Sequence, residues 1–399
     1  MLTSVPTSAA DQDKPKVVEF FAGIGLVRLG LEAAGFEVAW ANDIDVDKRD
    51  TYIGHFGRGS EQQRREELDR FLLRDVAGVH AADLPDEPIA LATASFPCTD
   101  LSLAGNREGL AGQHSGTFWE FARVLDELRR ADRQPPVVML ENVVGLATSH
   151  GGWDLRAAIK ALNDLDYSVD VLTLDARRFV PQSRPRLFIV GALNPPTAED
   201  SLDDPLRPEW LLAAHDHDGL VTHRAALPAP PEPMVTGLGD HIEKMRADDE
   251  RWWDATRTAA FADSLSPIQA ERLEQLKARR TNSHRTAYRR TRNGVAVWEI
   301  RPDDISGCLR TARGGSSKQA VVVAGGGEVR VRWMTPREYA RLMGAPDYTL
   351  RDVATNKALF GFGDAVCVPA VAWLAEHYLA PLVRGDLAEE TTDLHVVAG

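Results

Sequence analysis

A single cysteine stands where an apolar run gives way to a polar, glycine-containing segment. Residues 89–94 are predicted to form a buried strand, and Cys98 follows them in the sequence Phe-Pro-Cys. A second apolar run, residues 137–140, ends directly before Glu141. Open α/β folds bind ligands at the ends of their strands, so both side chains are expected at such an edge. The pair predicts a catalytic nucleophile and acid; the alternatives are a small packing residue and a surface or capping acid.

Strand and helix patterns alternate through the first half of the chain. Strands are predicted at 17–21, 38–41, 89–94, 137–140, 168–174 and 187–191. Helices are predicted at 27–34, 118–130 and 155–165. This alternation predicts an α/β fold whose mostly parallel sheet carries helices on both faces.

The alternation stops after residue 194, which suggests a second unit. Residues 200–233 are rich in Pro, Asp and His, and a glycine-punctuated, strand-like region runs from 295 to 333. We predict a disordered lead-in (1–15), a first domain (16–194 plus 357–385), a smaller second domain (195–356) and a C-terminal tail (386–399).

Composition narrows the class of protein. The chain has 399 residues and a net charge of −13, yet the stretch 272–337 holds 15 Lys and Arg against 5 Asp and Glu. That basic stretch is either a footprint for a phosphate backbone or a solvated surface. Three cysteines without CxxC spacing predict no disulfide framework and no metal site. No membrane-spanning run is expected, and a reducing cytoplasm fits the free thiols.

A glycine turn follows the first predicted strand. Residues 21–25 read Phe-Ala-Gly-Ile-Gly and precede a predicted helix. Such a turn lets backbone N–H groups approach a dinucleotide or another adenosyl cofactor, or it is only a tight turn. Asp43 lies about 20 residues further on, where an acid is placed to bind ribose hydroxyls. No Gly-Lys-Ser/Thr phosphate loop is present, so NAD and ATP are disfavoured.

The order of these motifs resembles the DNA (cytosine-5) methyltransferase family of bacterial restriction–modification type. The resemblance implies a Rossmann-like methyltransferase domain that binds S-adenosylmethionine (SAM), releases S-adenosylhomocysteine and uses no metal, joined to a target-recognition domain at 195–356. The matching segments are 21–25, 82–84, 96–98, 116–119, 141–143, 182–186, 335–338, 341–344 and 362–366.

The resemblance also implies roles for individual residues. Those implied in catalysis are Cys98, Glu141, Asn142, Arg184 and Arg186. Those implied in cofactor binding are Phe21, Ala22, Gly23, Gly25, Asp43, Ile44, Asp83, Leu84, Pro97, Phe118, Asp364 and Ala365. The chain departs from the family pattern at Leu26, Ile44, Thr99 and Asp364.

The chemistry explains why these residue types recur. A thiolate that adds to C6 of cytosine makes C5 nucleophilic toward the SAM methyl group, and a carboxyl at N3 stabilises the product of addition. The cytosine must first leave the duplex. Candidate DNA-binding residues are Arg107, Arg310, Arg313, Gly314, Gly315, Ser316 and Lys318. The expected partner is double-stranded DNA, bound by a monomer in the cytoplasm, with a cognate endonuclease encoded nearby.

Three other functions fit parts of the sequence. An RNA (tRNA) cytosine-5 methyltransferase would share the fold, but the large basic region disfavours it. A catalytically silent DNA-binding regulator would not need Cys98, Glu141 and Arg186 together. An NAD oxidoreductase would need an acid–base pair and a dinucleotide fingerprint that the glycine turn lacks.

Overall fold

The computed structural model describes residues 14–97, 116–197, 204–215, 217–292, 294–311 and 318–387. Six predicted site residues lie outside these ranges: Cys98, Arg107, Arg313, Gly314, Gly315 and Ser316. The predicted lead-in up to residue 13 and the tail from residue 388 lie outside them too.

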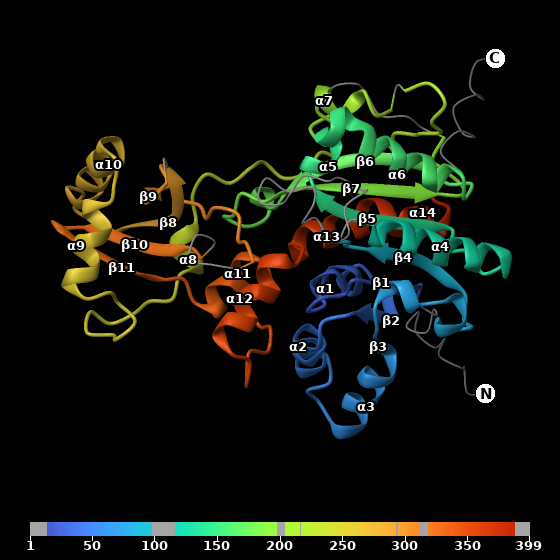
Figure 1. Cartoon of the computed structure of the whole chain (residues 1–399), viewed down its shortest axis with the longest axis horizontal. Coiled ribbons are helices and arrows are strands. Elements are labelled where there is room, and N and C mark those ends of the chain that lie inside the picture. The colour runs from blue at the N-terminus through green and yellow to red at the C-terminus, as the bar shows by residue number, and fades with distance from the viewer. Residues whose placement is uncertain are drawn as a thin grey trace, which may run out of the picture.

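Seven strands of the first domain form one sheet, in the order β3-β2-β1-β4-β5-β7-β6 (Figure 1). Their bounds are β1 Lys16–Phe20, β2 Glu37–Asp43, β3 Phe71–Leu73, β4 Ile89–Ala94, β5 Val137–Val143, β6 Ser168–Asp175 and β7 Pro185–Ala192. Strand β7 runs antiparallel to β5 and β6, and the other pairings are parallel. The predicted α/β fold with a mostly parallel sheet is therefore confirmed.

Successive strands are placed outward from β1 in both directions: β2 and β3 lie on one side of it, and β4 and the later strands of this sheet lie on the other. Strand β1 pairs in parallel with both β2 and β4, so the carboxyl ends of three strands meet there. Open α/β sheets bind ligands at such a point. The glycine turn after β1 and the Phe-Pro segment after β4 both open at this edge.

Helices cover both faces of the sheet. The helices of the chain are α1 Leu26–Ala33, α2 Val46–Phe56, α3 Glu61–Arg70, α4 Thr117–Arg130, α5 Gly145–Thr148, α6 Trp153–Asn163, α7 Glu209–Leu212, α8 Leu238–His241, α9 Ala255–Asp263, α10 Pro267–Lys277, α11 Pro336–Leu342, α12 Thr355–Asp364, α13 Val368–Leu374 and α14 Ala380–Arg384. One apolar core joins the sheet to α4 and α6, and a second joins it to α1, α13 and α14.

The second domain is built on an antiparallel sheet of four strands. The order is β11-β10-β8-β9, with β8 Ser283–Arg292, β9 Val295–Ile300, β10 Ala320–Gly325 and β11 Glu328–Trp333. Helices α9 and α10 pack on one face around a cluster that includes Phe261, Leu273 and Trp298. Figure 1 shows this domain standing apart from the seven-stranded sheet.

The packing suggests narrower bounds for the second domain than 195–356. Leu206 and Ala225 belong to a core of the first domain, and the backbone of Val169 on β6 bonds to Val221 and His223. Residues of α11 share a core with Ile24 and Phe362 of the first domain. The same core includes Leu238 and Val321, so we propose that the second domain spans about residues 238 to 334, with α11 at its junction with the first domain.

The C-terminal helices include one apolar stretch of 30 residues, Thr355–Arg384, that is long enough to span a membrane. Within the most apolar part of this stretch, 67% is buried inside the fold. Trp373, Leu374 and Tyr378 pack against the sheet beside α1. The stretch therefore serves as a core element of the first domain.

Candidate active site and nucleic-acid interface

The glycine turn takes left-handed backbone conformations that open it to a ligand. Phe21, Gly23 and Gly25 have φ values of 56°, 57° and 78°. A Cβ at Gly25 would lie 2.4 Å from the Phe56 ring, so only glycine fits there. A Cβ at Gly23 would meet nothing closer than 4.0 Å, which means that the backbone there faces open space.

Asp43 closes the turn from the end of β2. One carboxylate oxygen accepts a hydrogen bond from the backbone N–H of Gly23 at 2.9 Å, and the other accepts one from Asp45 at 2.9 Å. Asp43 is thus fixed beside the open face of Gly23. Each of its oxygens has a further lone pair for a ribose hydroxyl.

An apolar surface lies beside Asp43 at the ends of β2 and β3. Ile44 follows β2 and is 66% exposed, and Leu73 ends β3, paired with Asp43. Exposed aliphatic side chains at a ligand-binding edge can cover the face of a purine ring. Ile44 thus offers apolar contact where the family commonly has an aromatic residue.

Asp75 is an acid that the sequence reasoning missed. It comes two residues after the end of β3, it is exposed, and its carboxylate accepts only from the Ala77 backbone among the described residues. Asp83, the predicted adenine-binding acid, lies eight residues further on, and its oxygens bond to Arg74 and to the His80 backbone. Asp75 lies nearer the end of a strand than Asp83 and has fewer protein partners among the described residues, which favours it for this role, and only the very short β3 could have indicated it.

The other predicted cofactor residues form two groups, one buried and one exposed. Leu84 and Phe118 are buried, and the Phe118 ring packs 5.6 Å from that of Phe96. Pro97 is exposed beyond them. Asp364, at the end of α12, forms an ion pair of 2.9 Å with Lys48 on α2. Leu84 and Phe118 thus belong to a core of the first domain, whereas Pro97 and Asp364 are exposed.

Ala22 and Ala365 act through their backbones. Ala22 donates to the Asn42 carbonyl and accepts from Gly25, which fixes both ends of the glycine turn. The Ala365 carbonyl accepts from Arg184 at 2.7 Å. Both residues therefore shape the site through hydrogen bonds of the main chain.

Glu141 and Arg186 form the charged centre of the site. The antiparallel register of β5 and β7 sets Val143 opposite Arg186, which brings the Arg186 guanidinium to 2.9 Å from the Glu141 carboxylate. Burial raises the pKa of Glu141, although Arg186, Arg184 and the Ser95 hydroxyl oppose the rise. Burial thus shifts Glu141 toward the protonated form, and only that form of a carboxyl can donate a hydrogen bond as well as accept one.

Asn142 links this centre to the segment that carries the thiol. Its side-chain amide donates to the Phe96 carbonyl at 3.2 Å, and its oxygen accepts from the Val143 N–H at 2.8 Å. Phe96 stands two residues before Cys98. Asn142 therefore fixes the start of that segment beside Glu141.

Arg184 holds the two domains together. Its guanidinium donates to the carbonyls of Leu309, Gly363 and Ala365 at 2.6 to 2.9 Å. Gln182, also buried, bonds to Leu309 and to the carbonyl of Leu342. These contacts give Arg184 a structural role, so we assign the cation beside the reacting groups to Arg186 alone.

Cys308 lies in the same place, although its sequence context suggested simple packing. Its sulfur is 3.4 Å from an Arg184 nitrogen. Burial opposes ionisation, but the guanidinium groups of Arg184, Arg186 and Arg310 hold the pKa of the Cys308 thiol below its usual value. Cys367, in contrast, is buried among apolar groups that raise its thiol pKa to about 12, as a packing residue requires.

Two of the predicted DNA-binding residues are described, and both lie beside α12. The Arg310 backbone packs so closely on Gly363 that a Cβ there would lie 2.5 Å from it. The Lys318 ammonium donates to Asn356 at 2.8 Å. Both side chains are exposed or partly exposed at the junction of the domains.

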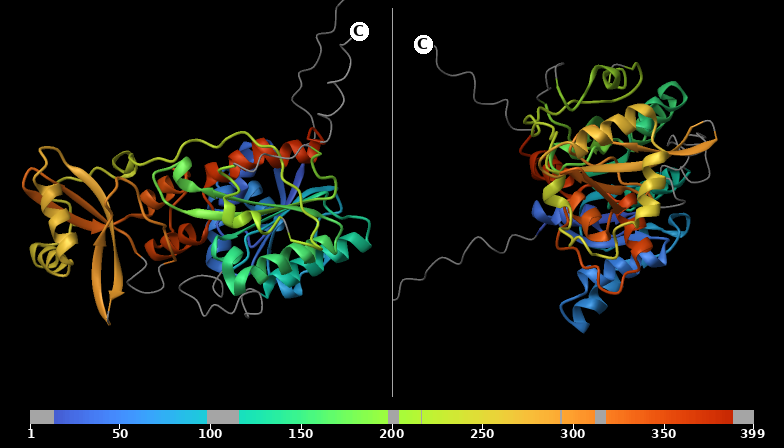
Figure 2. Two further views of the ribbon diagram at one scale, coloured as in Figure 1. Left: turned by 90° about the horizontal axis from the view of Figure 1, so that it is seen from above. Right: turned by 90° about the vertical axis from the view of Figure 1, so that its left-hand side faces the viewer.

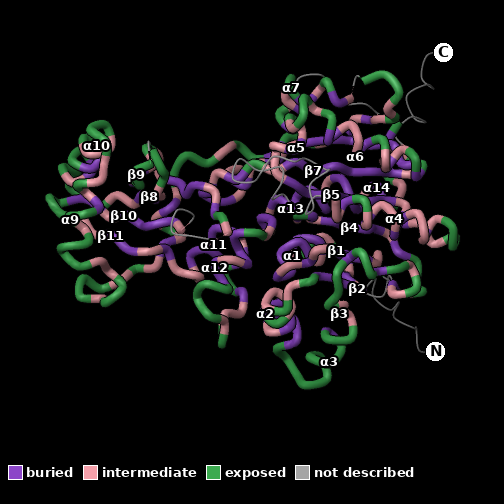
Figure 3. The backbone as a smooth tube through the Cα atoms, in the orientation of Figure 1, coloured by how far each residue is buried: buried purple, intermediate pink, exposed green. Residues whose placement is uncertain are grey.

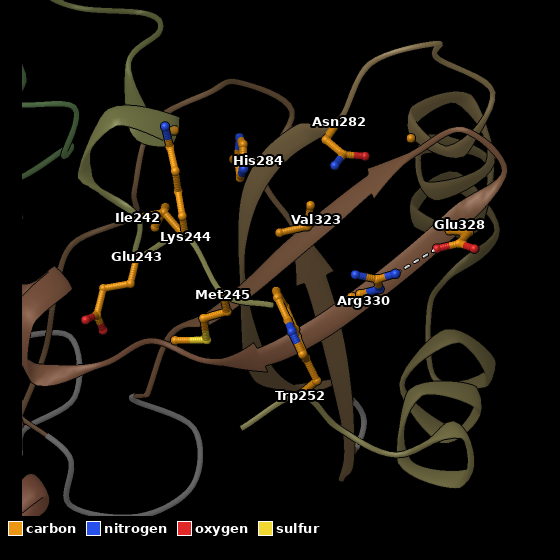
Figure 4. Close-up of a pocket in the computed structure, with 12 residues that line it drawn as sticks. Ile242, Glu243, Lys244, Met245, Trp252, Asn282, His284, Val323, Glu328 and Arg330 are labelled. Carbon is orange, nitrogen blue, oxygen red and sulfur yellow. Dashed lines mark hydrogen bonds and ion pairs between the residues drawn. The ribbon is translucent and has the colours of Figure 1, made fainter. Parts of the chain in front are cut away.

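A cavity of about 250 Å³ lies within the second domain, away from Glu141 (Figure 4). Trp252, His284 and Arg330 are among its lining residues. The cavity lies between the segment before α9 and the face of the four-stranded sheet that α9 and α10 do not cover. None of its lining residues belongs to the centre around Glu141 and Arg186.

The chain matches known proteins along almost its whole length. Residues 15–379 match the sequence profile of the family described as C-5 cytosine-specific DNA methylase. The Type II methyltransferase M.Bsp6I of Bacillus sp. is 27% identical over 372 residues, which cover 91% of this chain and 98% of the relative. The Type II methyltransferase M.NlaX of Neisseria lactamica is 27% identical over 370 residues, covering 92% and 97%.

Solved structures share the fold at lower sequence identity. The Dnmt2 methyltransferase of S. pombe has a TM-score of 0.58 at 18% identity and covers 93% of this chain and 99% of its own. The methyltransferase EhMeth of Entamoeba histolytica has a TM-score of 0.59 at 14% identity and covers 95% and 100%.

Proposed function

The chain belongs to the C-5 cytosine-specific DNA methylase family, and we propose that it methylates C5 of a cytosine flipped out of duplex DNA through a covalent bond from Cys98 to C6. The family implies SAM as the methyl donor. The observation that carries the proposal is the buried Glu141–Arg186 pair, which Asn142 links to the segment before Cys98. Strand β5 carries Glu141 and Asn142, β7 carries Arg186, and the segment after β4 carries Phe96.

The cofactor edge fits SAM. Open space faces Gly23, Asp43 is fixed beside it, and exposed Ile44 offers an apolar cover. We propose that Asp43 binds the ribose hydroxyls, that Ile44 contacts the adenine face, and that Asp75 accepts from the adenine amino group. SAM, when bound, supplies an electrophilic methyl group.

The residues around Glu141 activate the base. The Cys98 thiolate adds to C6, and the electron pair of the C5–C6 double bond then becomes available at C5. Glu141 donates a proton to N3 and accepts a hydrogen bond from the exocyclic amine, which its raised pKa favours. Arg186 keeps the carboxyl in place. After methylation a base or water takes the C5 proton, the electron pair of the C5–H bond reforms the C5–C6 double bond as the thiolate leaves C6, and N3 returns its proton to the Glu141 carboxylate.

Relatives named Type II methyltransferases support a proposal for the biological setting. We propose that the chain acts as a monomer on double-stranded DNA in the cytoplasm, and that it protects sites from a cognate restriction endonuclease. Residues of the second domain and its junction, including Arg310 and Lys318, would contact the DNA.

Trapping tests the covalent step. A duplex that contains 5-fluorocytosine in its recognition sites cannot lose the C5 substituent, so the enzyme should remain attached to it in the presence of SAM. We expect the adduct to disappear in Cys98→Ser and to persist in the matched Cys367→Ser variant, because Cys367 is a buried packing residue. Peptide mapping of the adduct to Cys308 or Cys367 would refute the proposal. Equal methylation of a tRNA panel would favour the RNA alternative.

A further inference from the structure

A two-stranded ribbon extends from the second domain. Strand β10 pairs with β8 only as far as Ala287. Beyond it, residues 288–292 pair solely with 295–299 of β9 among the described residues, and Gly294 completes the turn with a φ of 79°. Figure 2 shows these strands projecting past the rest of the domain, and Figure 3 shows their tip exposed.

The arginines at the tip of this ribbon do not contribute to a hydrophobic core. The tip residues, 290–292 and 294–296, are exposed and bury no core, whereas Trp298 nearer the base packs in the core of the domain. An isolated two-stranded hairpin is only marginally stable in water. The extension of five residues measures ~17 Å, whereas the major groove of B-DNA is about 12 Å wide and 8.5 Å deep and admits a two-stranded ribbon. The ribbon therefore has dimensions that suit insertion into a groove.

Glu299 orients an arginine at the end of the ribbon. One oxygen of Glu299 accepts from Arg292 Nε at 3.2 Å and from Nη2 at 2.8 Å. Glu299 thus engages the edge of the guanidinium formed by Nε–H and one Nη2–H. The other Nη2–H and the Nη1 hydrogens, which form the far end of the guanidinium, have no partner among the described residues. That end-on pair of donors is the edge that bonds bidentately to O6 and N7 of guanine.

The same acid argues against a simple phosphate contact. Glu299 also pairs with Arg290 at 3.1 Å, so one carboxylate offsets part of the charge of two arginines. A surface that only bound phosphates would gain by lacking Glu299, since a carboxylate repels them. A base-reading arginine gains from it, because the guanidinium is held in one orientation before DNA arrives.

We propose that the β8–β9 ribbon enters the major groove of the DNA substrate and that Arg292, oriented by Glu299, reads one guanine of the recognition sequence. The inference rests on the proposed function and adds a specificity-determining residue to it. Arg290 lies on the same face of the ribbon as Arg292. It pairs with Glu299, and its guanidinium carbon lies 5.0 Å from the centre of the Tyr288 ring, which stabilises the ribbon.

Site preference is the measurement that tests this role. A pool of duplexes with randomised sequence is methylated with SAM, and bisulfite sequencing reports the preference at each position around the modified cytosine. We expect wild type to require guanine at one position. Arg292→Ala should weaken that requirement about tenfold or more, with other positions unchanged. Arg292→Lys should relax it in part, because the single ammonium nitrogen lacks the rigid planar pair of donors that Glu299 orients, and Glu299→Gln should also relax it in part.

The matched control is Arg65→Ala, which removes an exposed arginine of α3 in the first domain. It should leave every preference unchanged. A uniform loss of methylation at all sites in Arg292→Ala, with a shallower salt dependence, would show a phosphate contact and overturn the base-reading role. Unchanged preferences in an active Arg292→Ala enzyme would overturn the inference alone. Absence of cytosine methylation by wild type would overturn the proposed function and this inference with it.

Discussion

Glu19 should make the stability of this protein fall as the pH rises. The side chain lies on β1, is 2% exposed, and neither carboxylate oxygen has a hydrogen-bond partner among the described residues. Burial raises the pKa of Glu19 to about 8; Arg28 opposes the rise, and Glu32 and Asp43 add to it. The Arg28 guanidinium already bonds to Glu67, so it compensates Glu19 poorly.

The sign and size of the effect follow from the two pKa values. In the unfolded chain Glu19 titrates near 4.5, and in the folded protein near 8, so the folded state binds more protons between these values. The contribution of Glu19 is therefore fully favourable below pH 4.5 and is lost as the pH rises through 8. Between pH 5 and pH 8 the loss amounts to at most about 3 to 4 kcal/mol.

Glu19→Gln removes this titration with almost no change of volume. Urea unfolding at a series of pH values, without cofactor, should show the variant more stable than wild type at pH 8 and nearly equal to it at pH 5. Glu250→Gln, at an exposed position, is the matched control and should follow wild type throughout. A constant difference between Glu19→Gln and wild type across this range would refute the reasoning.

Three further substitutions test the surroundings of the site. Asp170→Ala would remove the carboxylate that Arg207 pairs with at 2.5 Å, and would leave this 1% exposed guanidinium with Asp204 as an acidic partner. It should cost ~3 to 5 kcal/mol in urea unfolding at pH 7. Because the pKa of Asp170 is lowered against the effect of burial by its bonds to His215 and Arg207, this cost should shrink below about pH 4. Gly25→Ala should weaken SAM binding in calorimetry far more than Gly35→Ala, since both have positive φ but only Gly25 has neighbours within 4 Å. Cys308→Ser keeps a hydrogen-bond acceptor for the neighbouring Arg184 guanidinium, whereas Cys308→Val loses it at a cost of ~1 kcal/mol. Cys308→Val should therefore methylate about fivefold more slowly than Cys308→Ser, and equal rates would contradict a contribution of this hydrogen bond to the site.

Local patterns were sufficient to predict most of the first domain. The apolar runs at 89–94 and 137–140 coincide with strands β4 and β5, because buried strands need such runs wherever they pair. Strand β3 escaped prediction because three residues carry no periodicity. The antiparallel direction of β7 also escaped prediction, since the connection from β6, which decides it, is irregular.

Domain boundaries depended on contacts that no local pattern encodes. The segment around Leu206 and Ala225 is rich in turn residues and has no periodicity, yet Arg207 anchors it to the buried Asp170 on β6. The Ala225 N–H donates to the same carboxylate. Such a segment resembles a linker in sequence, and only its long-range partner shows that it covers the edge of the first sheet.

The site shows the same division between local and long-range information. Glu141 and Asp43 could be placed from sequence because each lies at the carboxyl end of a strand, and strand ends meet at one edge. Cys98 lies outside the described residues, and its role stays a prediction. Asp75 could not be placed in this way, because β3 was not visible. Cys308 could not, because its neighbours on the sequence are unrelated to its neighbours in space.

Arg184 and Arg186 show how one strand can serve two purposes. Side chains two residues apart in an extended chain point to the same side, so both guanidinium groups reach the junction of the domains. Arg184 bonds there to the segment that returns from the second domain and to the end of α12, whereas Arg186 bonds to Glu141. Strand β7 and the residue directly before it therefore both hold the second domain and orient Glu141, the carboxyl that we propose as catalytic. Replacing either arginine would disturb a different set of contacts on the same rigid element.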